Sequence, residues 1–171
     1  MHRRIFALLL AAGAIALFWF AGHSANAAPP AQGPVGDATK GAYIFAAAEG
    51  CGCHMTDKGF LAGGQEFDLG PAGKVYSRNI TSDKETGIGN WTDAEIITAV
   101  RTGKTPDGRQ LFPIMPYHIF SGMSDQDVAD LVAFIRTAPP IVNKVEDREL
   151  NIPVPPFDAP AAPAGRATLP Q

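Results

Sequence analysis

Apolar residues recur at helical spacing in three parts of the chain. In the clearest, Ser124 and Asp127 form a capping pattern and apolar side chains follow at i, i+3, i+4 and i+7: Val128, Leu131, Val132 and Ile135. Thr92 and Glu95 form a second capping box, before a segment that Gly103 ends. A third segment, 38–49, is rich in alanine and stops at Gly50. The pattern therefore predicts helices over 38–49, 92–103 and 124–136.

Two long stretches between these helices, 55–90 and 104–123, are rich in glycine and turn residues. Neither shows sustained alternation of apolar and polar positions, so we expect strands to be short at most. Loops this long are uncommon in a small domain unless they wrap something or act chemically. A large flat cofactor is one group around which they would fold.

The first residues have the pattern of an export signal. A short cationic start precedes an apolar run over 5–21, and Ala25-Asn26-Ala27 is a typical cleavage sequence before Ala28. A retained membrane anchor is the alternative for this segment. We therefore predict a signal peptide over 1–27, a linker over 28–37, one domain over 38–140 and a Pro/Ala-rich strap and tail over 141–171. The predicted location is the periplasm, with anchoring to the inner membrane as the alternative.

The charge of the chain is mildly acidic. Removal of residues 1–27 takes away Arg3 and Arg4 and no acidic residue, so the formal net charge goes from −3 to −5. The chain has no basic run, and a nucleic-acid-binding role has no support. His54 and His118 are the histidines that remain outside the leader.

The chain has two cysteines, and both lie in the sequence Cys51-Gly52-Cys53-His54. This is one residue short of C-x-x-C-H, the attachment motif of c-type haem. A disulfide between the two would close a small and strained ring, and a zinc site needs about four ligands. The sequence therefore favours haem over these alternatives, although a haem-free Cys/His metal-binding module stays open.

A candidate for the other axial ligand lies about 60 residues later. Met115 lies between Pro113 and Pro116 in the loop 104–123, so its thioether would be held rigidly. Met123 is a rival, but it directly precedes the Ser124 cap and is expected to pack against the helix start. His118 would give a bis-histidine site, although a surface or pocket histidine is the simpler interpretation.

With these residues in view, the chain resembles a class I c-type cytochrome, of the kind found as subunits of periplasmic dehydrogenases. Besides the cysteine motif, the resemblance depends on five strings: Leu61-Ala62-Gly63-Gly64, Tyr76-Ser77-Arg78-Asn79-Ile80-Thr81, Thr86-Gly87-Ile88-Gly89-Asn90-Trp91-Thr92, Asp107-Gly108-Arg109 and Met115-Pro116-Tyr117. It implies an all-α, cytochrome c-like fold, with three or more main helices and long loops around one covalently attached haem c. It also implies that the first and last helices cross, with Phe45 and Phe134 at their contact.

The resemblance implies a ligand set as well. His54 would be the proximal iron ligand and Met115 the distal one, with thioethers at Cys51 and Cys53. The haem pocket would be lined by Tyr76, Asn79, Ile80 and Trp91, for which ordinary core and turn positions are the competing interpretation. Two thioethers require a non-helical backbone, because side chains two apart on a helix point to nearly opposite sides. The glycines on either side of Cys51 make such a backbone accessible. A haem held by Cys53 alone is the alternative.

The resulting hypothesis is an electron carrier rather than an enzyme. Its redox partners would be a periplasmic dehydrogenase or membrane complex of the respiratory chain and an acceptor such as a terminal oxidase. A haem enzyme or sensor with a labile sixth ligand is the alternative among haem proteins.

Overall fold

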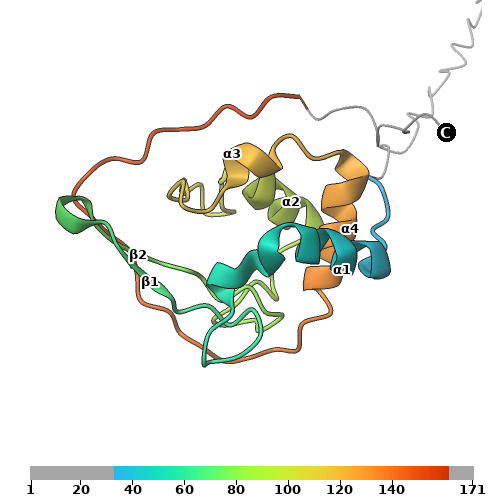
Figure 1. Cartoon of the computed structure of the whole chain (residues 1–171), viewed down its shortest axis with the longest axis horizontal. Coiled ribbons are helices and arrows are strands. Elements are labelled where there is room, and N and C mark those ends of the chain that lie inside the picture. Colours follow the sequence, from blue (N-terminus) through green and yellow to red (C-terminus); the bar gives the residue numbers. More distant parts are fainter. Residues whose placement is uncertain (1–32, 162–171) are drawn as a thin grey trace, which may run out of the picture. The chain divides into compact units, whose positions relative to one another are not determined.

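Residues 33–161 are the part of the chain that the computed structural model describes, except for the side chain of Glu49. They form four α-helices, two short 3₁₀ helices and one small antiparallel sheet (Figure 1). The predicted signal peptide, the first half of the linker (28–32) and the end of the tail (162–171) lie outside the described residues. Within 33–161, no helix is long and apolar enough to cross a membrane.

The crossing of α1 (Ala38–Ala47) and α4 (Asp125–Ile135) organises the domain. The Asp37 side chain caps α1 by accepting hydrogen bonds from two backbone amides, and the Ser124 hydroxyl caps α4 by accepting one, from the Asp127 amide. Gly41 lies against the backbone of α4 so closely that a Cβ there would meet the Asp130 carbonyl. The rings of Phe45 and Phe134 are 5.0 Å apart between centroids, which confirms the expected contact of the first and last helices.

The helix α2 (Asp93–Thr102) packs beside α4 and follows the predicted signals at both ends. Thr92 and Glu95 form the capping box, and Gly103 ends the helix in the left-handed region at φ +69°. The first helix is shorter than predicted: it stops at Ala47, and a 3₁₀ helix, η1 (Glu49–His54), continues the chain. One short helix, α3 (Tyr117–Phe120), was not predicted, because a single turn carries no periodic pattern.

The expectation of an all-α fold was too narrow. The strands β1 (Glu66–Asp68), β2 (Gly73–Tyr76) and β3 (Glu149–Leu150) form an antiparallel sheet in the order β1-β2-β3, and a 3₁₀ turn, η2 (Gly70–Ala72), joins the first two. These strands have two to four residues each, which agrees with the prediction that strands would be short at most. A sheet this small leaves almost no periodic signal in the sequence.

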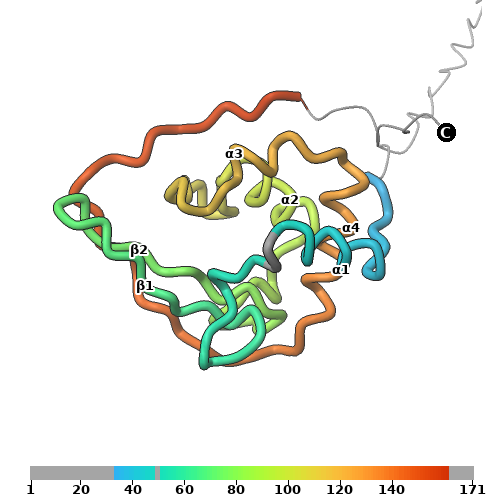
Figure 2. The backbone as a smooth tube through the Cα atoms, viewed as in Figure 1, coloured from blue at the N-terminus to red at the C-terminus, as the bar shows by residue number. Residues whose placement is uncertain are grey.

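The described part of the predicted strap and tail, 141–161, which we call the strap, follows α4 and runs around the domain (Figures 1 and 2). The amide nitrogen of Asn79 donates to the Ile141 carbonyl at 2.7 Å, and the Asn143 amide nitrogen donates to the Ala62 carbonyl at 2.9 Å. Further along, the strap contributes β3 to the sheet, and the ring of Phe157 lies 5.3 Å from that of Tyr117 on α3. The strap therefore ties the long loops of the domain to its helices.

Candidate functional site

A cavity of about 800 Å³ lies between η1, β2, α2 and the segment before α3. Its volume falls in the range of about 300–1,000 Å³ that small-molecule and cofactor sites occupy. The wall is mostly apolar, and it includes residues from α2 and α4 that also belong to the core. All eight residues predicted for the site line this one cavity: Cys51, Cys53, His54, Tyr76, Asn79, Ile80, Trp91 and Met115.

The cysteines reach the cavity because the chain leaves the α-helical path before them. The backbone at Cys51 has φ +46°, in the left-handed region that residues with a Cβ rarely adopt. Cys51 is half-buried against the core and Cys53 is exposed, yet both line the cavity, and neither is in a disulfide. Burial raises the pKa of the Cys51 thiol to about 11, and the charge of Cys53 adds to the rise. The Cys51 thiol is therefore protonated at neutral pH.

His54 is oriented by a backbone carbonyl. Its Nδ1 lies 2.6 Å from the carbonyl oxygen of Arg78, and because that oxygen can only accept, Nδ1 carries the proton and donates. Burial lowers the pKa of His54 below its ordinary value, against the effect of this hydrogen bond, so the ring is neutral at pH 7. Nε2 is then left with a free lone pair. Histidines that bind metals are typically held in this way, with the other ring nitrogen hydrogen-bonded to a carbonyl.

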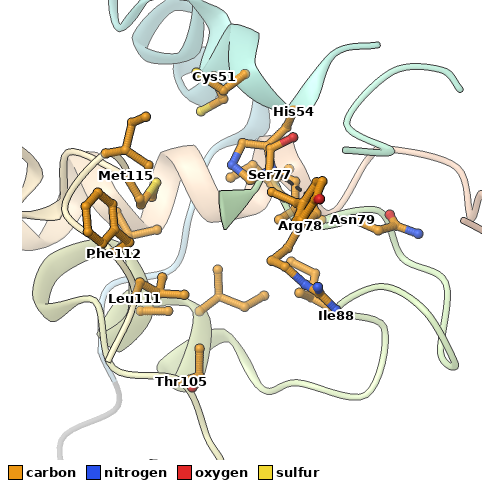
Figure 3. Close-up of a pocket in the computed structure, with 18 of the residues that line it drawn as sticks. Cys51, His54, Ser77, Arg78, Asn79, Ile88, Thr105, Leu111, Phe112 and Met115 are labelled. Atoms are coloured by element: carbon orange, nitrogen blue, oxygen red, sulfur yellow. Dashed lines mark hydrogen bonds between the residues drawn. The ribbon is translucent and has the colours of Figure 1, made fainter. Parts of the chain in front are cut away.

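Met115 enters the cavity from the side opposite His54, as Figure 3 shows. Two hydrogen bonds fix its backbone: its own amide donates to the Phe112 carbonyl at 3.1 Å, and the Tyr117 amide donates to the Met115 carbonyl at 2.8 Å. The rival Met123 packs against the core and does not line the cavity. His118 is exposed and also lies outside the cavity lining.

The four predicted pocket residues have different surroundings. Ile80 and Trp91 pack against the core while they line the cavity. The amide of Asn79 is fully used elsewhere: its nitrogen donates to Thr86 and to the strap, and its oxygen accepts from the backbone and hydroxyl of Thr81. The hydroxyl of Tyr76 donates to Glu66 at 3.3 Å. Asn79 and Tyr76 therefore also act as structural residues in the cavity wall.

Three arginines that received no role from the sequence line the same cavity: Arg78, Arg109 and Arg148. Burial lowers the pKa of Arg78, and the positive charge of Arg109 lowers it further, because the two guanidinium groups repel one another. Two of the three stand in strings that carried the family resemblance, Tyr76–Thr81 and Asp107–Arg109. Arg78 and Arg109 are paired with Asp147 and Asp107 at 3.7 and 3.8 Å, and Glu85 also lines the cavity. The remaining N–H groups of the guanidiniums can still donate to a ligand that carries negative charge.

The comparison with known families decides the interpretation of this cavity. The model of the family described as Cytochrome c matches residues 38–139. The chain belongs to the cytochrome c family. This result confirms the resemblance to c-type cytochromes, and it implies covalently bound haem c as the cofactor.

Curated relatives give the family a context. The chain is 38% identical over 140 residues to the fructose dehydrogenase cytochrome subunit of Gluconobacter japonicus, covering 78% of this chain and 29% of that protein. It is 38% identical over 129 residues to the cytochrome c subunit of a quinone-dependent alcohol dehydrogenase of Gluconacetobacter polyoxogenes, covering 72% and 27%. A diheme cytochrome c-type protein of Cereibacter sphaeroides is 33% identical over 153 residues, covering 86% and 51%. The chain thus spans about half or less of each of these relatives.

The residues of the cavity fit a haem group. A neutral imidazole with a free Nε2 and a thioether lie on opposite sides, two thiols line one edge, and the wall between them is apolar. The arginines supply positive charge suited to the propionate carboxylates of haem. The donor set of histidine and methionine is one that haem proteins use for electron transfer.

Proposed function

We propose that this cytochrome is a periplasmic monohaem electron carrier that passes single electrons from a dehydrogenase or membrane complex to an acceptor such as a terminal oxidase. One observation carries the proposal. His54, oriented by the Arg78 carbonyl, and Met115 enter one cavity from opposite sides, and both cysteines line that cavity.

The ligand pair supports electron transfer rather than catalysis. Bound haem would supply a one-electron redox centre, and His54 and Met115 would both hold its iron and leave no ligand site for a substrate. The remaining work of the chain is to orient the ligands, exclude water with apolar side chains and set the local charge. A methionine ligand and an apolar surrounding are both typical of carriers of raised potential.

Attachment through both cysteines is part of the proposal. On a regular α-helix Cys51 and Cys53 would point to nearly opposite sides, whereas the left-handed backbone at Cys51 lets both thiols face the cavity. The chain has one cysteine pair, which supports a single haem even though one relative is named as diheme.

Arg78, Arg109 and Arg148 would hold the propionates. The guanidinium of Arg78 also donates to the Glu146 carbonyl at 2.7 Å, and that of Arg148 donates to the Gln110 carbonyl at 2.6 Å. Both are therefore fixed in place by the backbone, which lowers the entropic cost of holding a carboxylate.

The partner and the location are inferred from the relatives and the leader. Relatives are named as cytochrome subunits of fructose, alcohol and gluconate dehydrogenases, which supports a dehydrogenase as the electron donor. The sequence of residues 1–27 supports export. Within residues 33–161 no three His, Cys, Asp or Glu side chains gather as a metal site, so the haem-free module gains no support.

The test is to express the full chain in a host with haem-maturation machinery. We expect a red protein with a weak near-infrared methionine-to-iron band in the ferric state, and we expect Met115→Ala to lose that band while it keeps the haem. A Met123→Ala variant is the matched control and keeps the band. A ferric wild-type protein without the band, or one that binds cyanide at once, would favour the haem enzyme or sensor instead.

The attachment is tested on the same protein. Alkylation of the denatured, reduced holoprotein detects free thiols, and two thioethers leave none to react. We expect Cys51→Ala and Cys53→Ala each to shift the pyridine haemochrome band toward that of a singly attached haem. One alkylated cysteine in the wild type would show that only a single thioether forms.

A further inference from the structure

Two arginines lie at the ends of α2 and α4. Each of them binds the segment that leads into the other helix. Arg101, in the last turn of α2, donates to the carbonyls of Ser121 and Met123 at 3.0 and 2.7 Å and to the carboxylate of Asp125 at 2.9 Å. Those groups lie immediately before α4 and in its first turn.

Arg136, which ends α4, makes the reciprocal set of bonds. It donates to the carbonyls of Ile88 and Trp91 and to the carboxylate of Asp93. Asp93 is the first residue of α2. Each arginine thus uses two carbonyls and one carboxylate to fasten the loop that precedes the opposite helix, and the two sets of bonds match in number and kind.

The loops they fasten differ in one respect. The loop to which Arg101 donates is continuous with the segment that carries Met115. The loop to which Arg136 donates contains no candidate iron ligand. A short chain of backbone hydrogen bonds connects Arg101 to Met115: the Ser121 amide donates to the Tyr117 carbonyl, and the Tyr117 amide donates to the Met115 carbonyl, both at 2.8 Å. The other end of the segment is fixed by the Leu111 amide, which donates to the Gly103 carbonyl at 2.7 Å.

The Arg101 clamp is also the better shielded from water. The side chain of Arg101 is 11% exposed and that of Arg136 is 26% exposed. Hydrogen bonds from a charged donor are stronger where water is excluded, so the clamp at Arg101 is well placed to hold a loop closed.

We propose that Arg101 is a positioning residue for the sixth iron ligand: it keeps the Met115 segment closed on the haem and so controls how readily Met115 leaves the iron. The inference rests on the proposed function, because it requires Met115 to be a ligand. Arg101 does not line the cavity, and it acts on the iron through the backbone of 115–123.

The experiment compares Arg101→Gln with Arg136→Gln in the full-length, haem-loaded protein. Both variants remove a guanidinium that holds two carbonyls and a carboxylate, so both lower the melting temperature. Since each charge-assisted hydrogen bond changes an equilibrium by about tenfold or more, we expect Arg101→Gln to bind cyanide in the ferric state at least about tenfold faster than the wild type. We also expect its near-infrared methionine band to weaken, while Arg136→Gln keeps the wild-type band and cyanide rate.

A second substitution keeps the test usable if Arg101→Gln does not accumulate. Arg101→Lys retains the charge beside Asp125, but a lysine cannot reproduce the planar fork that reaches two carbonyls. We expect its cyanide rate to exceed that of the wild type and to stay below that of Arg101→Gln. Wild-type rates in the Arg101 variants, or equal acceleration in the Arg101 and Arg136 variants, would overturn the proposal.

The two proposals fail in different ways. A wild-type protein that lacks the methionine band contradicts the assignment of Met115 itself. A wild-type protein that has the band, together with an Arg101→Gln variant that retains both the band and slow cyanide binding, contradicts only the role of Arg101.

Discussion

Gly41→Ala tests the contact on which the haem-binding segment depends. The α1–α4 crossing supports the chain that leads into Cys51, and Gly41 lies at its closest approach. A Cβ at Gly41 would lie 2.6 Å from the Asp130 carbonyl carbon and 2.8 Å from the Phe134 Cβ, and closer still to the carbonyl oxygen. These neighbours belong to the α4 backbone or its first side-chain atom, so they cannot move aside without moving the helix.

Two opposing effects set the change in the free energy of unfolding of Gly41→Ala. Alanine is favoured over glycine inside a helix by about 1 kcal/mol. Overpacking costs about 1–3 kcal/mol, and separating the helices also weakens the Phe45–Phe134 contact, worth about 0.5–1.5 kcal/mol. The cost of the steric clash exceeds the gain in helix propensity, because the two helices must move apart to relieve the clash. We expect a loss of about 2 kcal/mol in the free energy of unfolding and a melting temperature lower by about 5–10 °C.

The assay is thermal or chemical denaturation of the haem-loaded protein. Gly33→Ala is the control, since no atom lies within 4 Å of a Cβ built there. A Gly41→Ala protein as stable as the wild type, or more stable, would mean that helix propensity outweighs the contact and that α1 and α4 are not packed as closely as described.

Three further predictions concern the loops. Gly103→Ala should lower the denaturation midpoint, because the position has φ +69° and a Cβ would lie 2.6 Å from the Tyr117 ring; a melt of the variant checks this. Asn79→Ala leaves buried partners without their hydrogen bonds, a cost of about 1–3 kcal/mol, and should make the strap cleavable after Ile141 in limited proteolysis. Hydrogen bonds from Thr86 hold the pKa of Asp83 below its ordinary 3.8, so their stabilisation is present above that pH and lost below it. Asp83→Asn should therefore flatten the acid limb of the stability–pH curve, and an unchanged limb would contradict the assignment.

The helices were predictable because each carries its own boundary signals. The Thr92–Glu95 capping box and Gly103 marked α2 from end to end, and the Ser124 cap marked the start of α4. By contrast, β3 has two residues and pairs with a strand more than 70 positions earlier, so no local pattern announces it. The end of α1 at Ala47 could not be predicted from the sequence either, because the alanine and glutamate that follow it are good helix formers.

The sequence predicted residues that line one cavity, but it did not predict the hydrogen bonds that hold them in place. Cysteine, histidine and methionine at these spacings indicate haem chemistry by residue type alone. The arginines did not stand out, since a single arginine in a loop is usually a solvated surface residue. Arg101 and Arg136 acquire a role only when the fold brings each to the opposite loop, and the amide of Asn79 is committed to a strap 60 residues away. Such long-range hydrogen bonds leave no trace in local sequence.

The shortened motif at Cys51 becomes understandable once backbone conformation is considered. Removing one spacer residue rotates the first cysteine away from the second on any regular helix, so the chain must change its path to return the thiol to the cavity. It does so at Cys51 itself, with φ +46°, at a cost of about 1–2 kcal/mol for a residue with a Cβ. Strain of this kind persists only where the surroundings enforce it. Here α1 fixes the chain on one side of Cys51, and the bond from His54 to the Arg78 carbonyl fixes it on the other, so the strain falls on the cysteine between them.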